Sequence, residues 1–375
     1  MELSLTGEQA EFRDEIAAFV DTEIVPQAAS IDRADVFPEG LVATLAEQGY
    51  LGMPFALEYG GMGLDYHAYA EGIAEISRGS GGLGTVVAAH TSLAGTMINR
   101  FGTDTQRKTY LTPLAEGNDI GAFALSEAGA GSDVPAMETT AVLDNDSYRI
   151  TGDKLWTSNG SVADTIVTFA KTDPNAGRNG ISAFIVRPTE DSGVSVIRTE
   201  QKIGDHGCPA AALSFDAVKV PVARRLGAEG DGFVQALKTL NGGRITIAAR
   251  GVGLARAAQD VLLENVPAES SQRYRHTIAE NATKITAAES LLHRAAADRM
   301  ADRPYIESAA VAKLYASEIS REVSGAAIDL LGLPAAVEDA RLQRIYRDAK
   351  LNEIYEGTSE ILKNTIAQRV IERSA

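Results

Sequence analysis

A glutamate stands in an aromatic and glycine-rich setting near the end of the chain, in the stretch IYEGTSEI, residues 354–361. Glu356 follows Tyr355 and precedes Gly357. A carboxylate that is shielded from water has a raised pKa and becomes a stronger base toward carbon acids. The alternative is a solvated glutamate at the end of a helix. These residues by themselves leave both interpretations open.

A second candidate site is the glycine-rich stretch FALSEAGAGSD, residues 123–133. Small residues at positions 128–132 allow the backbone to approach a ligand closely, and their N–H groups can bind an anion such as a pyrophosphate. Ser126 and Ser132 add hydroxyl groups. The alternative interpretation is a plain loop that leads into a strand.

The only tryptophan of the chain lies in WTSNG, residues 156–160. Trp156 could stack beside a planar cofactor, and the small hydroxyl residues after it could donate hydrogen bonds to the edge of that cofactor. The alternative is a tryptophan of the hydrophobic core followed by an Asn-Gly turn.

Asn241 and Arg244 are three positions apart, so that on a helix they share one face and could bind a polar arm of a ligand. An internal contact of the helix is the alternative. The five histidines show no metal-ligand spacing, and Cys208 has no base beside it, so neither a metal site nor a cysteine nucleophile is expected. GVGLA, residues 251–255, lies in an apparent helix and therefore is no nucleotide-binding fingerprint.

The composition is that of an ordinary globular enzyme. The 375 residues include 45% apolar and 23% charged residues, enough for two or three packed layers or domains. The net charge of −16 argues against a nucleic-acid partner. One cysteine excludes an intramolecular disulfide and favours a reducing compartment. No apolar run approaches the roughly 20 residues of a membrane helix, and the N-terminus lacks a basic signal-peptide region, so that we expect a cytoplasmic protein.

The elements that must position these residues fall into three zones. The sequence predicts helices over 1–120, a central β domain over 121–228 and a helical bundle over 229–375. Thr6 and Gln9 form a capping box for the first helix. β-Branched runs separated by turns in the middle zone are typical of a small sandwich or barrel. The expected fold class is α+β, mostly α.

These motifs occur together and in order, and the chain resembles the acyl-CoA dehydrogenase family of flavoproteins, of the short- and medium-chain type. The resemblance rests on FALSEAGAGSD, on KLWTSNG and on two longer stretches, residues 201–233 and 346–362. It spans nearly the whole chain. It implies an N-terminal helical domain, a central β-sandwich or barrel domain and a C-terminal four-helix bundle, with FAD between the β domain and the bundle.

By this resemblance Glu356 is the base that takes an α-proton from an acyl thioester, while a hydride passes from the β-carbon to flavin N5, giving the trans-2-enoyl thioester. Hydrogen bonds to the thioester carbonyl make the α-proton acidic enough for removal. The residues expected to contact FAD are Phe123, Leu125, Ser126, Gly131, Ser132, Trp156, Ser158, Thr358 and Glu360. The residues expected to contact the substrate are Ser132, Asn241, Arg244, Tyr355 and Gly357.

The resemblance also implies partners. The acyl group would be carried by CoA or by an acyl carrier protein, and electrons would pass to an acceptor such as an electron-transfer flavoprotein. A homo-oligomer, either a dimer or a tetramer, is expected. Two other functions stay open at this point: a flavin oxidase or monooxygenase on the same fold, and a flavin-poor subunit of a heteromeric dehydrogenase.

The chain departs from the family pattern in two kinds of place. Asn241, Glu360 and His206 stand where the family has Asp, Gln and Arg. The Arg-x-x-Phe-Gly segment is missing from residues 262–284, which are shortened, and GLPAAV at 332–337 replaces a Gly-Gly-x-Gly-Tyr turn. In the family both segments reach the FAD of a neighbouring subunit.

This loss predicts a change in how FAD is held between subunits. Arg273 or Arg275, which lie near the shortened segment, could substitute for the missing contacts in a homo-oligomer. The alternative is a heteromer in which a related chain supplies the missing contacts.

Overall fold

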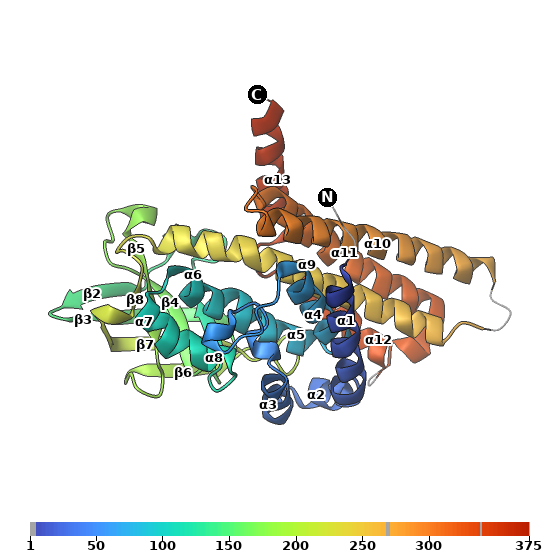
Figure 1. The fold of residues 1–375 in the computed structure, drawn as a ribbon, viewed down its shortest axis with the longest axis horizontal. Helices are drawn as coiled ribbons and strands as arrows, with labels where there is room; N and C mark the ends of the chain where they lie inside the picture. Colours follow the sequence, from blue (N-terminus) through green and yellow to red (C-terminus); the bar gives the residue numbers. More distant parts are fainter. Residues whose placement is uncertain (1–4, 268–270, 338–339, 375) are drawn as a thin grey trace.

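The structure is a computed structural model that describes residues 5–267, 271–337 and 340–374. The sheet formed by the middle of the chain lies at one end of the molecule, beside helices from both ends of the chain (Figure 1), and the predicted α+β, mostly α fold class is confirmed. Residues 268–270, inside the shortened segment 262–284, lie outside the described residues.

Short helices make up the N-terminal part. The α-helices are α1 Gly7–Phe19, α2 Ala28–Ala34, α3 Glu39–Glu47, α4 Tyr66–Gly79, α5 Gly81–Ala88, α6 Thr96–Phe101, α7 Asp104–Gln106 and α8 Thr112–Ala115. Single turns of 3-10 or π-helix connect them: η1 Val20–Ile24, η2 Tyr50–Gly52, η3 Leu57–Tyr59, η4 Ala89–Gly95 and η5 Arg107–Leu111. The predicted capping box is present, since Thr6 Oγ1 accepts from Gln9 N at 3.3 Å and Gln9 Oε1 accepts from Thr6 N at 2.8 Å.

The central sheet is mixed, and its two halves face each other. The strands are β1 Gly121–Ala124, β2 Thr140–Asp144, β3 Ser147–Ser158, β4 Thr165–Lys171, β5 Ile181–Val186, β6 Val194–Thr199, β7 Ala210–Pro221 and β8 Arg225–Leu226, with the turns η6 Val134–Ala136, η7 Gly177–Gly180 and η8 Val222–Arg224. The order is β6-β7-β3-β2-β4-β5-β8, and β1 pairs in parallel with β4. One pair, Thr140 with Lys171, links β2 to β4. Buried side chains of both halves, such as Phe184 and Leu213, share one core.

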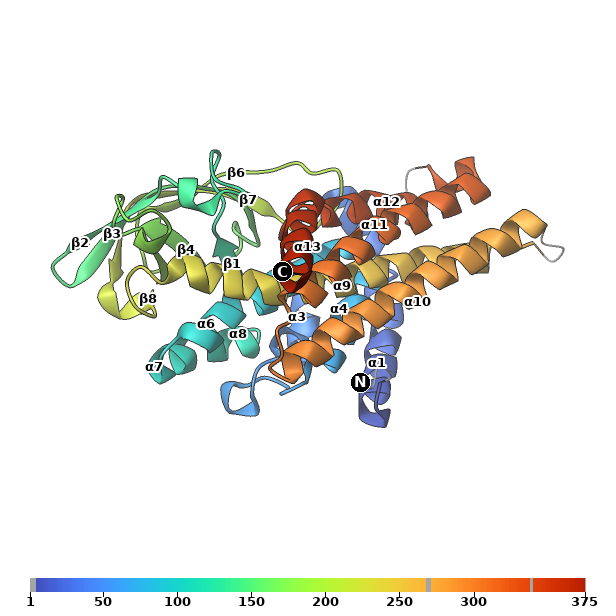
Figure 2. The ribbon, with the colours of Figure 1, turned by 90° about the horizontal axis from the view of Figure 1, so that it is seen from above.

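The C-terminal part is a helical bundle. Its helices are α9 Gly232–Glu264, α10 Gln272–Met300, α11 Ile306–Leu331, α12 Arg341–Asn352 and α13 Ser359–Ser374, with the turn η9 Leu333–Ala335. Figure 2 shows α9 running from the β domain to the far end of the bundle, and α13 projects away from the body in Figure 1. Buried residues of α1 and α4, such as Ile16 and Ile73, share a core with Ile247 and Leu292 of the bundle. The N-terminal helices and the bundle therefore form one packed unit.

A buried ion cluster connects the three parts. Arg250 of α9 forms an ion pair with Asp205, which lies in the connection between β6 and β7, and also donates to Asn352 of α12. Asp348 Oδ1 accepts from the backbone N of Asp205 at 2.7 Å. The hydroxyl of Tyr355 donates to Asp205 Oδ2 at 3.1 Å. This cluster fixes the position of the α12–α13 turn relative to the β domain.

Candidate active site

The turn between α12 and α13 holds Glu356 in an unusual backbone conformation. Glu356 has φ 50° and Gly357 has φ 99°, so two successive residues lie in the left-handed region. Glycine adopts this region freely, whereas a glutamate there costs on the order of 1–3 kcal/mol and persists only where the surroundings hold it. Ser359 N donates to Glu353 O at 3.0 Å and closes the turn. The strained turn directs the Glu356 side chain toward α9.

The carboxylate of Glu356 packs against the backbone of α9. The residue as a whole is partly exposed, but its Oε2 atom is buried and has no hydrogen-bond partner among the described residues. A Cβ placed on Gly243 would lie 2.1 Å from Oε2. Burial raises the pKa of Glu356 to about 7, although the cations Lys313 and Arg244 act in the opposite direction. A carboxylate with a near-neutral pKa and an unoccupied oxygen is suited to general-base chemistry.

Lys313 of α11 supports the same turn from the other side. Its side chain is completely buried, and Nζ donates to the carbonyl of Gly357 at 2.7 Å. Burial lowers the pKa of Lys313 to about 7, while Glu356 favours its charged form. The lysine makes no ion pair with a carboxylate in the described part of the chain. Its charge therefore acts on the turn and on Glu356.

Asn241 and Arg244 contact each other on α9, as their spacing predicts. Arg244 Nη1 donates to Asn241 Oδ1 at 2.7 Å. The Nε of Arg244 is buried without a partner among the described residues. Burial lowers the pKa of Arg244, and the nearby Glu356 carboxylate favours the charged form. An anchored guanidinium beside a candidate base can bind a polar or anionic arm of a ligand.

Trp156 lies at a bulge of β3, where the pairing with β7 shifts between Lys154 and Thr157. Its φ is 59°, and 59% of its surface is exposed. Bulges redirect side chains and are frequent next to active sites. Ser158, two residues on, is partly buried and pairs with Ala210 of β7. An exposed tryptophan held by a bulge offers a flat surface to a planar ligand.

The loop after β1 is held by a buried lysine. Lys154 Nζ donates to Glu127 Oε1 at 2.6 Å and to the carbonyl of Leu125 at 3.3 Å. Burial lowers the pKa of Lys154 to about 8, and Glu127 favours the charged form. Leu155 N donates to Ser126 O at 2.8 Å and fixes the loop to β3.

The remaining predicted residues of this loop differ in what they can offer. The side chains of Phe123 and Leu125 are buried in the core, so only their backbone can reach a ligand. Gly131 and Ser132 are exposed, and a Cβ placed on Gly131 would meet nothing within 4 Å.

The other predicted residues of the C-terminal motif have structural partners. Thr358 Oγ1 accepts from Ile361 N at 3.3 Å and caps α13. Glu360 is exposed in the first turn of α13. The hydroxyl of Tyr355 is directed into the buried ion cluster, where it contacts Asp205. The structure thus gathers Glu356, Gly357, Asn241 and Arg244 at α9, whereas residues 123–132, Trp156 and Ser158 gather at the β domain.

Three further residues escaped the sequence analysis. Lys313 gave one weak signal, because it is a lone lysine among the alanines of α11. Gly243 gave none, since its contact is with a residue far along the chain. Thr157 Oγ1 is buried without a partner in the described structure, next to Trp156, and the Thr-Ser pair alone did not distinguish it from Ser158.

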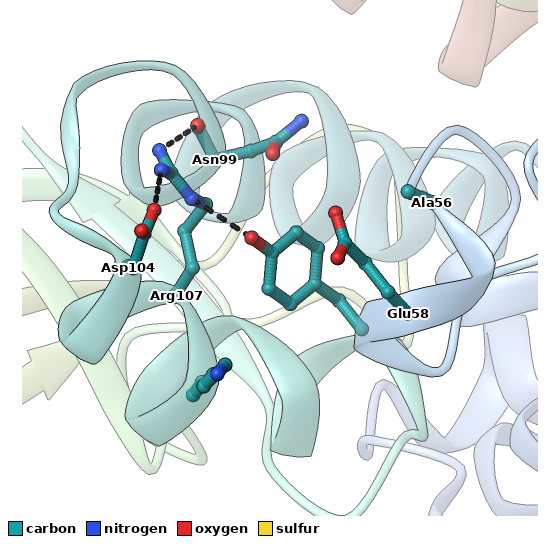
Figure 3. A pocket seen from close by; sticks show the side chains of 7 residues that line it. Ala56, Glu58, Asn99, Asp104 and Arg107 are labelled. Carbon is teal, nitrogen blue, oxygen red and sulfur yellow. Dashed lines mark hydrogen bonds and ion pairs between the residues drawn. The ribbon is translucent and has the colours of Figure 1, made fainter.

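A separate hollow of about 510 Å³ lies on the surface of the N-terminal part (Figure 3). Its lining residues are Ala56, Glu58, Tyr59, Asn99, Asp104, Arg107 and Lys108. Arg107 spans it, with Nε donating to the Tyr59 hydroxyl at 3.1 Å and Nη1 to the Asn99 carbonyl at 3.2 Å. None of the predicted site residues lines this hollow.

Two classes of site find no support. Within residues 5–267, 271–337 and 340–374, no group of three or more histidine, cysteine or acidic side chains could hold a metal ion. Burial raises the pKa of the Cys208 thiol to about 12, which disfavours the nucleophilic thiolate. No helix among these residues is long and apolar enough to cross a membrane.

Comparison with known families covers the whole chain. Residues 6–118 match the acyl-CoA dehydrogenase N-terminal domain, residues 122–218 the middle domain and residues 230–371 the C-terminal domain. The short-chain specific acyl-CoA dehydrogenase of Clostridium acetobutylicum is 39% identical over 99% of this chain and 100% of its own length.

Solved structures give the same result. Butyryl-CoA dehydrogenase from Megasphaera elsdenii superposes with a TM-score of 0.96 at 32% identity, over 99% of this chain and 100% of that one. A chain from a structure described as the electron transferring flavoprotein of Acidaminococcus fermentans gives a TM-score of 0.96 at 37% identity, over 99% of each chain.

Proposed function

The chain belongs to the acyl-CoA dehydrogenase family of flavin oxidoreductases, and from this premise we propose that Glu356 is the base that removes the α-proton when an acyl-CoA is oxidised to its trans-2-enoyl thioester. The observation that carries the proposal is the Oε2 atom of Glu356, buried against Gly243 without a hydrogen-bond partner among the described residues. That atom packs against a residue of α9 that has no side chain, and it has no donor among the described residues, so it is free to accept a hydrogen from a substrate.

The residues of the β domain fit a bound FAD, which when bound supplies the two-electron oxidant of the reaction. The exposed Trp156 and the unpartnered Thr157 hydroxyl suit a planar group with polar edges. The open backbone at Gly131 suits a pyrophosphate. In this proposal Ser126 and the backbone of Phe123 and Leu125 line the flavin.

The remaining predicted cofactor contacts come from both sides of the cleft. Ser158 would contact the flavin ring, and Ser132 the pyrophosphate or the pantetheine arm. Thr358 and Glu360, at the start of α13, would contact the tail of FAD.

The charges around Glu356 suit a base that works near neutral pH. Burial raises its pKa to about 7, so that about half of the groups are ionised at pH 7. Lys313 and Arg244 both favour the ionised form. The backbone N–H of Glu356 would donate to the thioester carbonyl and make the α-proton more acidic. Lys313 holds that backbone through the Gly357 carbonyl.

The substrate arm would lie along α9. Arg244 and Asn241 form a fixed polar pair there, suited to the pantetheine and phosphate groups of CoA. Gly357 leaves room beside the thioester, and the ring of Tyr355 would form a wall of the cleft while its hydroxyl stays in the ion cluster. Similarity to short-chain and butyryl-CoA dehydrogenases favours a short acyl group.

Assembly and electron transfer extend the proposal. The similarity to a chain from a structure described as an electron transferring flavoprotein favours such a protein as the electron acceptor.

We propose domain boundaries of 1–120, 121–228 and 229–375, which are supported by the three matched ranges. The protein would form a homo-oligomer in which Arg273 or Arg275 partly replaces the missing contacts to FAD.

The test is anaerobic bleaching of the protein's flavin absorbance by acyl-CoA substrates of different chain lengths. We expect bleaching by short acyl-CoA substrates and formation of the enoyl product. A flavin-loaded protein that no acyl-CoA bleaches would rule the proposal out. Persistence of the reduced flavin in air would separate a dehydrogenase from an oxidase or monooxygenase.

A further inference from the structure

A second charged group without a counterion reaches α9 beside the candidate base. Arg299 lies in the last turn of α10, and its Nη1 is buried with no hydrogen-bond partner among the described residues. The neighbouring carboxylate Asp298 is already paired with Arg303, at 2.9 Å. A buried guanidinium nitrogen without an acceptor is costly, so such a group in a native fold calls for a ligand.

The position of Arg299 is fixed by two adjacent glycines of α9. A Cβ placed on Gly242 would lie 1.8 Å from Arg299 Nη1, and a Cβ placed on Gly243 would lie 2.1 Å from Glu356 Oε2. Consecutive Cα atoms are about 3.8 Å apart, so the two charged atoms are no more than roughly 11 Å from each other. The two charged atoms therefore lie against adjacent residues of one helix.

Tyrosine side chains lie near this guanidinium, Tyr66 and Tyr69 from α4 and Tyr305 from the start of α11. The guanidinium of Arg299 lies 3.9 Å from the ring centre of Tyr66 and 5.5 Å from that of Tyr305. Tyr69, whose hydroxyl contacts Thr91 Oγ1 at 2.5 Å, is completely buried. Burial raises the pKa of Tyr69, and the charges of both Arg299 and Glu356 act on it. Tyr69 thus lies within electrostatic reach of both groups.

On the basis of the proposed function, we propose that Arg299 binds a carboxylate at the far end of the acyl chain, so that the preferred substrate is a dicarboxylic acyl-CoA. A methyl-ended chain would leave the guanidinium unpaired, whereas a carboxylate can accept two parallel hydrogen bonds from it. The Tyr66 and Tyr305 rings partly compensate the cation but supply no acceptor in this direction.

The separation of the two charges sets the chain length. A distance of at most roughly 11 Å, less a contact of about 3 Å at each end, leaves at most about 5 Å for the chain beyond the α-carbon. A glutaryl or adipyl chain has this reach. The distal carboxylate takes no part in the bond changes, which remain the loss of one α-hydrogen and one β-hydrogen and the formation of the α,β double bond.

The first experiment uses the wild-type holoenzyme and substrates matched in chain length. We compare kcat/KM for glutaryl-CoA with that for pentanoyl-CoA, and adipyl-CoA with hexanoyl-CoA. We expect the carboxylate-ended substrate to be preferred at least about tenfold, the size of one charge-assisted hydrogen bond. Equal or better use of the methyl-ended substrates would overturn the inference.

Variants then assign the preference to Arg299. Arg299→Met should lose at least about tenfold on the carboxylate-ended substrates and little on the methyl-ended ones, and Arg299→Lys should keep part of the preference. Gly242→Ala should also reduce the preference, because its Cβ would displace Nη1. Arg294→Met removes an exposed cation of the same helix and should leave the ratio unchanged. An unchanged ratio in Arg299→Met would contradict the inference.

A binding measurement separates this inference from the proposed function. Calorimetry compares S-(4-carboxybutyl)-CoA with S-pentyl-CoA, two thioethers without a carbonyl to activate the α-hydrogen. Tighter binding of the carboxylate, lost in Arg299→Met, supports the subsite even if no acyl-CoA bleaches the flavin, which would refute the proposed function alone. Equal binding of the two thioethers, together with bleaching by methyl-ended substrates, would refute the subsite alone.

Discussion

Two buried lysines hold the two sides of the candidate active site, and they do so differently. Lys154 of the β domain has a carboxylate partner, since its Nζ lies 2.6 Å from Glu127 Oε1. Lys313 of the bundle has a neutral acceptor, the Gly357 carbonyl at 2.7 Å. Both side chains are completely buried, and burial lowers the pKa of Lys154 to about 8 and that of Lys313 to about 7.

The difference lies in where each charge is neutralised. The charge of Lys154 on β3 is neutralised by Glu127 of the loop after β1, so this lysine holds that loop to the strand and contributes little field beyond the pair. Lys313 has no carboxylate in contact among the residues that the structure describes, and the nearby Glu356 is the largest influence in favour of its charged form. A lysine of similar burial can therefore be a structural anchor in one place and an electrostatic partner of a catalytic base in another.

The largest expected effect on the reaction rate comes from replacing Glu356, the candidate base that lies beside Lys313. Glu356→Gln should lower the rate of flavin bleaching by at least roughly 10²–10⁴-fold, because the amide cannot accept a proton. The FAD content should be unchanged, since the loop held by Lys154 is intact. Rapid mixing with acyl-CoA measures the rate, and wild-type bleaching in this variant would disprove the assignment of the base.

Removing Lys154 from its ion pair with Glu127 should lower the stability of the fold more than it lowers the reaction rate. Lys154→Met leaves Glu127 buried without its partner, which costs about 3–5 kcal/mol of unfolding free energy. Denaturant unfolding measures this loss, and the FAD content per chain should fall with it. The double variant Lys154→Met, Glu127→Gln should recover part of the stability. No recovery would indicate that the pair is not the source of the effect.

Moving the base without changing its chemistry gives a third test. Gly243→Ala places a Cβ where Glu356 Oε2 now lies, so the carboxylate must shift. A displacement of about 1 Å from productive geometry can cost on the order of 10²-fold in rate. Gly242→Ala is the matched control, since its Cβ meets Arg299 and not Glu356, and it should leave bleaching by butyryl-CoA close to that of wild type.

Replacing Lys313 by a neutral residue should shift the pH dependence of the flavin reduction rate. Glu356 must be ionised to act, so the reduction rate rises with pH through its pKa of about 7. The Lys313 cation opposes the rise in that pKa, and Lys313→Met should therefore move the rising limb to higher pH. An upward shift of about one pKa unit would lower the ionised fraction at pH 7 from about one half to about one tenth, so we expect about a fivefold loss of rate at pH 7 and recovery at higher pH.

The smallest effect is expected on the flavin side. Ser158→Ala removes one neutral hydrogen bond, worth about 0.5–1.5 kcal/mol, so flavin reduction should slow by roughly tenfold or less. Substrate binding should be nearly unchanged. Stopped-flow measurement of the reduction rate decides this point, and an unchanged rate would remove Ser158 from the site.

Short-range sequence patterns predicted the helices and strands and the contacts between residues close together in the chain. Asn241 and Arg244 meet because helical spacing places them on one face, and the capping box at Thr6 is a contact between near neighbours.

The remainder depends on contacts between distant segments. The burial of Lys313 results from the packing of α11 against the α12–α13 turn. The contact of Gly243 with Glu356 joins residues far apart in the chain. The bulge that turns Trp156 outward depends on the register of β3 with β7. None of these has a periodic signature in the sequence.

The buried ion cluster around Arg250 has a consequence for the order of events during synthesis. Arg250 requires Asp205, which is made earlier, and Asn352, which is made about a hundred residues later. Until α12 leaves the ribosome, the Arg250 guanidinium, which is buried in the folded protein, lacks half of its partners. Compact domains usually fold in turn as they emerge, but here the early parts cannot complete their packing alone. We expect the nascent chain to remain open to chaperones and proteases until its last helices are made.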